Sequence, residues 1–269
     1  MNQDNVQILD IETVIKAKMG GKKSLPKWLI NLVKKIIHQD FINEYLKEGY
    51  IGVPFCENCL RYLNVNIEVE GLENLPDEGK YTFVSNHPLG GIDGVTLGAI
   101  IGKKYDGKIK FLLNDFLMSL HGMAPLGIPI NKVGGQARQL PALINDTFNS
   151  DDQVIIFPAG LCSRKINGKV QDLPWTKTFI TKSIATKRDI IPIHFIGENS
   201  KRFYRVANLC KKLKLKFNLA MVLLPDELYK GQGKTFKVVI GKPIPYTHFD
   251  KSKTMVEWTR TMRDYIYTL

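Results

Sequence analysis

From residue 63 onward, short β-like runs alternate with helix-like segments, and this alternation constrains the fold more than any other feature of the chain. The predicted strands are rich in Val, Ile and Phe and lie at 64–72, 79–86, 108–114, 127–132, 153–158, 189–197 and 236–244. Helices are predicted at 93–105, 134–149 and 174–188 and after Lys253. Nearly continuous apolar strands are typical of a sheet covered on both faces, and strands that alternate with helices pair in parallel. We therefore expect an α/β fold with a mostly parallel central sheet flanked by helices, over residues 63–269.

Residues 1–62 are predicted to form an N-terminal amphipathic helical region. Within a helix expected at 24–48, Trp28 and Leu32 belong to an apolar face, whereas Lys27 and Lys35 lie on the opposite face. A lysine-rich amphipathic helix of this kind suits a membrane interface. It could equally pack on its own domain, so the residues alone leave both interpretations open. We expect the region to associate with a membrane.

The formal net charge of +12 predicts a negatively charged partner, which could be an anionic membrane, nucleic acid or a phosphorylated substrate. Residues 200–217 carry seven Lys or Arg and no acidic residue. They could form a solvated face, a membrane-docking patch or a patch that binds an acidic carrier protein. No run approaches the roughly 18 consecutive apolar residues of a spanning helix, and the N-terminus does not resemble a secretion signal. We expect a cytoplasmic protein that is peripherally associated with the inner membrane surface.

The stretch SNHPLGGIDG at 85–94 follows the predicted strand at 79–86 and holds the candidate catalytic residues His87 and Asp93. A neutral imidazole can accept a proton near neutral pH, and a carboxylate on its other nitrogen fixes the tautomer. Gly90 and Gly91 allow a tight turn, and we expect their N–H groups to be free to face a substrate oxygen. The competing interpretation is a turn histidine followed by an aspartate that caps a helix.

Four blocks in this order resemble the lysophospholipid and glycerol-phosphate acyltransferase superfamily, which has the PlsC-like fold. They are NHPLGGIDG at 86–94, PLGIPINKVGG at 125–135, IIFPAGLCSRK at 155–165 and DIIPIHFIG at 189–197. The resemblance implies that His87 and Asp93 are catalytic. It also implies substrate-binding roles for a further set of residues: Asn86, Gly90, Gly91, Lys132, Pro158, Gly160, Ser163, Arg164 and Lys165.

Two departures from the family pattern bear on the substrate. Five residues rather than the usual four separate His87 from Asp93, and Ala159 stands where the third block normally has a glutamate that helps to hold glycerol phosphate. Both features resemble a hemolysin-like branch that includes acyltransferases of ornithine- or glycine-containing aminolipids. The resemblance therefore favours a lyso-aminolipid over lysophosphatidate as the acyl acceptor.

By this resemblance, His87 would deprotonate the acceptor hydroxyl, which would attack a fatty acyl thioester on acyl carrier protein or coenzyme A. We expect no cofactor beyond this thioester co-substrate. We also expect no metal, because Cys56 and Cys59 form a CxxC without a second ligand pair at zinc spacing. One alternative is a 1-acylglycerol-3-phosphate or glycerol-3-phosphate acyltransferase. Another is a non-catalytic basic binder of anionic membranes or nucleic acid. Nucleic acid is not expected as a partner, because the chain lacks an aromatic–basic ribonucleoprotein signature and a clear helix-turn-helix.

Overall fold

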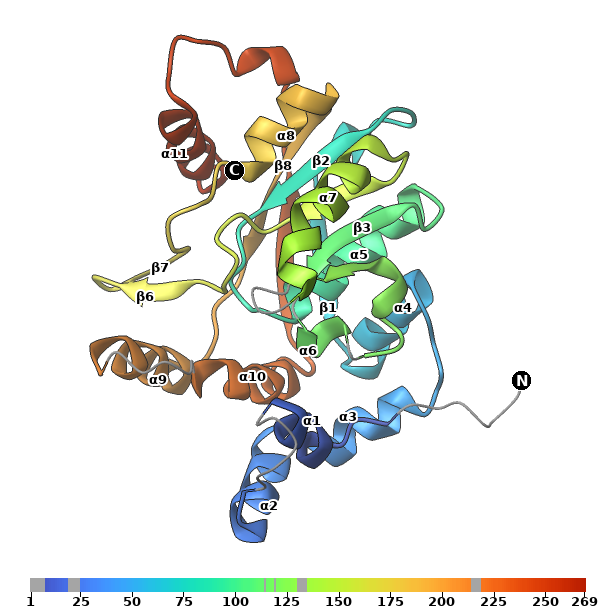
Figure 1. Cartoon of the computed structure of the whole chain (residues 1–269), viewed down its shortest axis with the longest axis vertical. Helices are drawn as coiled ribbons and strands as arrows, with labels where there is room; N and C mark the ends of the chain where they lie inside the picture. Colours follow the sequence, from blue (N-terminus) through green and yellow to red (C-terminus); the bar gives the residue numbers. More distant parts are fainter. Residues whose placement is uncertain (1–7, 19–24, 114, 119, 130–134, 214–218) are drawn as a thin grey trace.

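A computed structural model describes residues 8–18, 25–113, 115–118, 120–129, 135–213 and 219–269 (Figure 1). The described residues form a central seven-stranded sheet of order β1-β9-β8-β2-β5-β3-β4. Its strands are β1 (Asn66–Glu70), β2 (Tyr81–Ser85), β3 (Ile109–Leu113), β4 (Gly127–Pro129), β5 (Gln153–Ile156), β8 (Asp189–Ile196) and β9 (Thr235–Ile240). Neighbouring strands run parallel except for β8 and β9, which are antiparallel. The predicted α/β fold with a mostly parallel sheet is confirmed.

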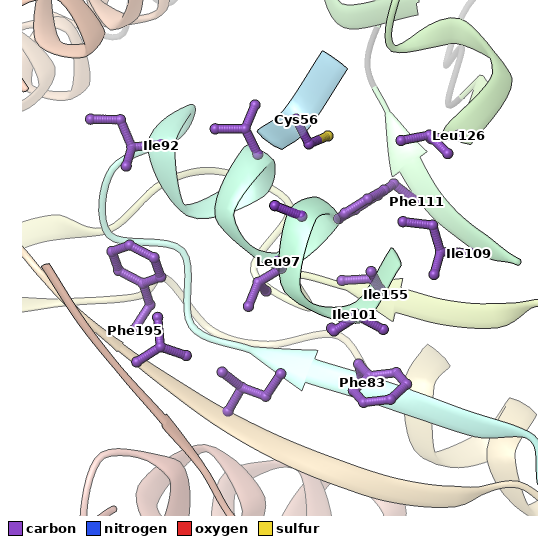
Figure 2. Close-up of a cluster of buried hydrophobic side chains, with 14 of the residues drawn as sticks. Cys56, Phe83, Ile92, Leu97, Ile101, Ile109, Phe111, Leu126, Ile155 and Phe195 are labelled. Carbon is purple, nitrogen blue, oxygen red and sulfur yellow. The ribbon is translucent and has the colours of Figure 1, made fainter. Parts of the chain in front are cut away.

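Helices cover both faces of the sheet. On one face, α5 (Ile92–Lys104) and α4 (Val53–Tyr62) pack over the strands, and Figure 2 shows Leu97 and Ile101 of α5 facing Phe83 of β2. On the other face, α8 (Thr178–Thr186) and α11 (Met255–Ile266) form a second cluster with the strands. α7 (Gly135–Asn149) contacts α8. The two faces of the sheet are therefore buried, as the apolar strands predicted.

A small hairpin, β6 (Arg164–Ile166) and β7 (Lys169–Gln171), was not predicted from the sequence. Its strands are too short and polar to give a β pattern. Asn167 and Gly168 at its turn both have positive φ, +50° and +81°, which is the conformation of the tight turns that join antiparallel strands. The hairpin projects from one side of the sheet (Figure 1) and carries Arg164.

In the described part of residues 1–62, three short helices precede α4: α1 (Ile11–Lys18), α2 (Lys27–Ile36) and α3 (Gln39–Leu46). The single helix predicted at 24–48 is wrong at His38, whose left-handed φ of +52° separates α2 from α3. No described helix is both long and apolar enough to cross a membrane. The boundary at 62/63 stays a prediction, although α4, which precedes it, shares its core with α5.

Two further helices link this region to the sheet. α9 (Lys201–Lys212) and α10 (Leu224–Lys230) flank the 3-10 helix Leu219–Leu223 in the chain, and both α-helices lie between the sheet and helices α1, α2 and α3 (Figure 1). Ile36 of α2 packs against the apolar cluster that α9 forms with this 3-10 helix. The remaining described elements are short: α6 (Asp115–Met118) and the 3-10 helices Leu72–Asn74, Ala124–Leu126 and Tyr246–His248.

Candidate active site

The register of the central strands brings two motif loops together. Val84 of β2 lies beside Ile156 of β5 in a parallel pair, so both strands end at the same edge of the sheet. The loop after β2 contains His87 and the loop after β5 contains Ser163. The Ser163 N–H donates a 2.7 Å hydrogen bond to the His87 carbonyl, which joins the two loops directly. This edge is where open α/β sheets place their ligands.

His87 and Asp93 form the pair expected from their spacing. His87 Nδ1 lies 2.9 Å from Asp93 Oδ2. Asp93 lies in the first turn of α5 and is fully buried, and its Oδ2 also accepts the N–H groups of Leu89 (2.9 Å) and Gly90 (3.2 Å). Its Oδ1 accepts the Gly94 N–H at 2.9 Å. Because three backbone donors hold the carboxylate, it can hold the imidazole in one orientation and leave Nε2 as the remaining ring nitrogen.

The electrostatics of the pair favour its charged form. Burial by itself lowers the pKa of His87, but the Asp93 carboxylate and, to a smaller extent, Asp172 outweigh burial and raise it above 6.5. Arg164 opposes this rise. Burial raises the pKa of Asp93, yet His87 and the backbone N–H groups outweigh burial and lower it below 3.8. The site therefore stabilises an imidazolium, which is what a base becomes when it accepts a proton.

Two residues that were not predicted from the sequence hold the loop after β2 that contains His87, which we call the histidine loop. Phe157, directly after β5, stacks on the His87 ring at 4.1 Å between centroids and 26° between planes. Asn199 donates through Nδ2 to the carbonyls of Pro88 (3.2 Å) and Leu89 (3.3 Å). Phe157 belongs to a recognised block and could have been inferred. Asn199 is more than 100 residues from its partners and has no local signal.

Arg164 is buried beside the pair without a carboxylate of its own. Its Nη1 donates to the carbonyls of Cys162 (2.5 Å) and Ser163 (3.2 Å), and its guanidinium carbon lies 5.6 Å from the Phe203 ring centroid. In the part of the chain that the structure describes, none of the ion pairs involves Arg164. A buried guanidinium without a counter-charge is suited to bind an anionic substrate group.

Gly90 and Gly91 mainly set the backbone conformation of the loop that contains His87. The expectation of a free N–H is wrong for Gly90, because Asp93 accepts it. Gly90 adopts a φ of +79°, whereas Gly91 precedes α5 with no hydrogen bond to its N–H among the described residues. Asn86 is buried, and its amide exchanges two hydrogen bonds with the backbone of Phe195 in β8, at 2.9 and 2.7 Å. In this geometry its amide binds the sheet.

The other predicted binding residues have diverse surroundings. The Pro158 carbonyl accepts the Thr176 N–H at 3.0 Å, and Gly160 is an exposed turn residue with a φ of +66°. Lys165 is half-buried on the β6–β7 hairpin. Lys132 lies outside the described residues. None of these described residues forms a hydrogen bond or ion pair with His87 or Asp93, so their roles stay predictions.

Asp172 was not singled out from the sequence, yet it lies at the centre of the site. Its carboxylate accepts the His87 backbone N–H at 3.2 Å, the Ser163 hydroxyl at 2.5 Å and the Trp175 indole N–H at 2.8 Å. Burial raises the pKa of Asp172, and these hydrogen bonds only partly oppose the rise. Its place after the unpredicted β7 strand explains why sequence reasoning missed it.

A second histidine–aspartate pair lies between His38 and α10. His38 Nε2 is 2.9 Å from Asp226 Oδ1, and its ring stacks on Tyr229 at 3.8 Å. Asp226 also forms ion pairs with Lys230 (2.5 Å) and Arg202 (3.6 Å). Because cations already surround this carboxylate, the pair serves to anchor the α2–α3 junction to α10.

Comparison with known proteins agrees with this geometry. The acyltransferase family model matches residues 14–269. The chain belongs to this acyltransferase family. Two curated relatives of this acyltransferase, from Bacteroides thetaiotaomicron and Phocaeicola vulgatus, are each 52% identical to it over 272 residues. The matches cover 100% of this chain and 100% and 98% of the two relatives, and both relatives are named lyso-glycine lipid O-acyltransferase.

The acyltransferase also resembles a solved structure. The crystal structure of the 1-acyl-sn-glycerophosphate acyltransferase PlsC from Thermotoga maritima aligns with a TM-score of 0.51 at 16% identity, covering 88% of this chain and 78% of that chain. At this identity the likeness shows the fold alone. The predicted PlsC-like fold and the predicted acyltransferase class are both confirmed.

Proposed function

We propose that the protein transfers a fatty acyl group from a thioester to the hydroxyl of a lyso-glycine lipid, with His87 as the general base. The observation that carries the proposal is the His87–Asp93 pair at the edge of the sheet, in a chain 52% identical along its whole length to two lyso-glycine lipid O-acyltransferases. A thioester is already activated, so the reaction needs no nucleophilic side chain. The site therefore needs a base, a means of holding the acceptor, and access for the thioester.

In the proposed mechanism, His87 acts through Nε2. Its Nδ1–H donates to Asp93, and Nε2 accepts the proton of the acceptor hydroxyl as the oxygen attacks the thioester carbonyl. The new C–O bond forms, the C–S bond breaks, and the imidazolium returns its proton to the departing thiolate. Two features support the assignment. The His87 side chain is 18% exposed, so a substrate can reach it, while Asp93 is fully buried. The raised pKa of His87 also means that the site stabilises the imidazolium.

Arg164 would hold the acceptor's anionic group. A lipid built on the amino group of glycine keeps the glycine carboxylate, which a guanidinium can bind through two parallel hydrogen bonds. Ala159 fits the same substrate, since it leaves this loop without the negative charge that a glutamate would bring near a carboxylate. The acyl donor is acyl carrier protein or coenzyme A, and each is an arm of the test.

The first test is acyl transfer by the purified protein, followed by mass spectrometry of the product. Donors would be acyl-carrier protein and acyl-coenzyme A, and acceptors would be lyso-glycine lipid, lyso-ornithine lipid and lysophosphatidate. We expect diacylated glycine lipid from wild type and a loss of about 10²–10⁴-fold for His87→Ala, the usual contribution of a general base. His121→Ala, at an exposed histidine, is the matched control and should retain activity. Turnover of lysophosphatidate alone would overturn the acceptor, and an active His87→Ala would overturn the base.

The substrates also support a membrane-docking role for two helices. In α2, Trp28 and Leu32 are one helical turn apart and exposed, and Leu209 and Leu213 repeat this spacing at the end of α9. α2 contains three lysines and no acid, and α9 contains five Lys or Arg and no acid. We call these four apolar side chains the docking surface. Exposed apolar pairs among basic side chains suit an anionic leaflet, and the proposed location is the cytoplasmic face of the inner membrane.

A further inference from the structure

Asp172 is a buried residue whose carboxylate forms no ion pair with the described side chains. Its residue is 1% exposed, and no described Lys, Arg or His side chain forms an ion pair with it. Burying an unpaired carboxylate is costly, and such groups are found mostly where a site uses them. Because Asp172 lies beside the histidine loop, we expect it to have a function in the site.

The hydrogen bonds of Asp172 favour its ionised form, whereas burial opposes it and raises its pKa. A backbone N–H and an indole N–H can only donate, so Oδ1 accepts from His87 N and Oδ2 accepts from Trp175 Nε1. Ser163 Oγ adds a third bond, at 2.5 Å, to Oδ1. Each carboxylate oxygen therefore accepts an N–H group, which stabilises the charged form.

The C-terminal helix fixes the backbone of Asp172. The Asp172 N–H donates to the Tyr267 hydroxyl oxygen at 2.8 Å, and Arg263 Nη2 donates to the Asp172 carbonyl at 2.8 Å. Arg263 also reaches Gln171 Oε1 at 3.2 Å. Asp172 thus joins four parts of the chain: the loop after β2, the loop after β5, the β6–β7 hairpin and α11.

We propose that Asp172 is a positioning residue for acyl transfer, whose buried carboxylate fixes the backbone of His87 and Ser163 and adds to the stabilisation of the imidazolium that the ring's own partner, Asp93, provides. Asp93 orients the ring, whereas Asp172 holds the main chain that carries it. Through Ser163 it also sets the start of β6, where Arg164 lies. This inference rests on the proposed function, because it requires His87 to be the base.

The electrostatic contribution of Asp172 gives the role a measurable signature. Asp172 is among the groups that raise the pKa of His87, after Asp93. Removing its charge should lower the pKa of His87, so the rise of kcat/KM with pH should occur at lower pH. A role confined to holding the fold would leave that pH unchanged.

Asp172→Asn is the first variant, because it keeps the shape but cannot accept from both His87 N and Trp175 Nε1 on separate oxygens. We expect kcat to fall about ten- to a hundredfold, the cost of a small displacement of a catalytic group. The acid limb of the kcat/KM profile should move to lower pH, and an NMR titration of His87 should move the same way. Asp172→Glu keeps the charge, so it should lose kcat while its acid limb stays near that of wild type.

Asp189→Asn is the matched control. Asp189 accepts the Tyr246 N–H at 3.0 Å, at the start of β8 and therefore at the opposite end of the sheet from His87. It should keep the wild-type kcat and pH profile. If Asp172→Asn does not fold, Tyr267→Phe, which removes only the hydroxyl beside the Asp172 N–H, should show a smaller loss of kcat.

The outcomes separate this inference from the proposed function. If His87→Ala retains activity, the general base is wrong and the proposed function fails. If His87→Ala is inactive but folded Asp172→Asn matches wild type in kcat and in the His87 titration, Asp172 is structural only and the inference is wrong. A drop in kcat with an unchanged titration in Asp172→Asn would also remove the electrostatic part of the inference.

Discussion

At the scale of single residues, the proposed chemistry depends on how His87 is surrounded. Its ring lies between the Asp93 carboxylate at 2.9 Å and the face of Phe157, and its main chain is held by Asp172. The raised pKa has a consequence for stability as well. Protonated His87 stabilises the fold below its ordinary pKa of 6.5, and this contribution is lost as the pH rises through the higher pKa of the folded state.

Asp93→Asn should reduce kcat by about 10³–10⁴-fold near pH 7, the effect of removing the carboxylate from a catalytic histidine in serine proteases. In wild type, the acid limb of kcat/KM should lie above pH 6.5, because protonated His87 cannot accept a proton. The variant loses the largest contributions that raise the pKa of His87, so its limb should move to lower pH. Rate profiles over a range of pH on both sides of this limb measure both effects. A limb that stays in place would show that His87 is not the titrating group.

At the scale of elements, the loop between β2 and α5 accommodates its five-residue spacer through backbone geometry. The Leu89 and Gly90 N–H groups both turn toward Asp93 in the first turn of α5, which requires the positive φ of Gly90. The space above Gly90 is also filled. A Cβ there would lie 2.9 Å from Leu224 Cδ2 and 3.3 Å from Cys162 Cβ.

Gly90→Ala should therefore lose both stability and activity. A non-glycine residue at a φ of +79° costs about 1–2 kcal/mol, and the contact with Leu224 adds to it by displacing the loop that carries His87. Gly168→Ala is the matched control, since its φ is +81° and no atom lies within 4 Å of the position that the alanine methyl would occupy. Urea unfolding should show a loss for both variants, whereas only Gly90→Ala should lose kcat. Equal kcat values in the two variants would contradict a role for this loop in positioning the base.

At the scale of the whole molecule, the sequence could predict contacts between residues close together in the chain, but not contacts between distant residues. His87 and Asp93 are six residues apart, so their pairing followed from a strand, a turn and a helix start. The contacts of Asp172 with His87 and of Asn199 with Leu89 span 85 and 110 residues, and depend on the packing of loops that carry no periodic pattern. The antiparallel direction of β9 was equally invisible, because an apolar strand has the same sequence pattern in either direction.

At the same scale, the docking surface predicts that the protein binds an anionic membrane. The docking surface combines helices about 170 residues apart, and Ile36 of α2 packs against the cluster that α9 forms with the 3-10 helix Leu219–Leu223. The 68% exposed Trp28 should insert into an anionic bilayer, since burying a large apolar side chain gives about 1.5–3 kcal/mol. Val256 on α11 is 62% exposed, and α11 lies at the opposite end of the molecule from α2 (Figure 1), so Val256 supplies a matched control.

Trp28→Ala/Leu32→Ala should weaken binding to phosphatidylglycerol-containing vesicles at least about tenfold in a sedimentation assay, and Val256→Ala should bind as wild type does.

Arg205→Glu/Lys212→Glu should also weaken binding, because each basic residue near the membrane surface contributes about 1 kcal/mol. Salt screens this contribution, so raised salt should reduce the difference in binding between this variant and wild type. Wild-type protein that fails to bind anionic vesicles would overturn the proposed docking. Normal binding by the Trp28/Leu32 variant, with binding lost only in the charge variant, would assign docking to α9 alone. Since acyl transfer to a soluble short-chain acceptor does not need a bilayer, all of these variants should keep it, which separates docking from catalysis.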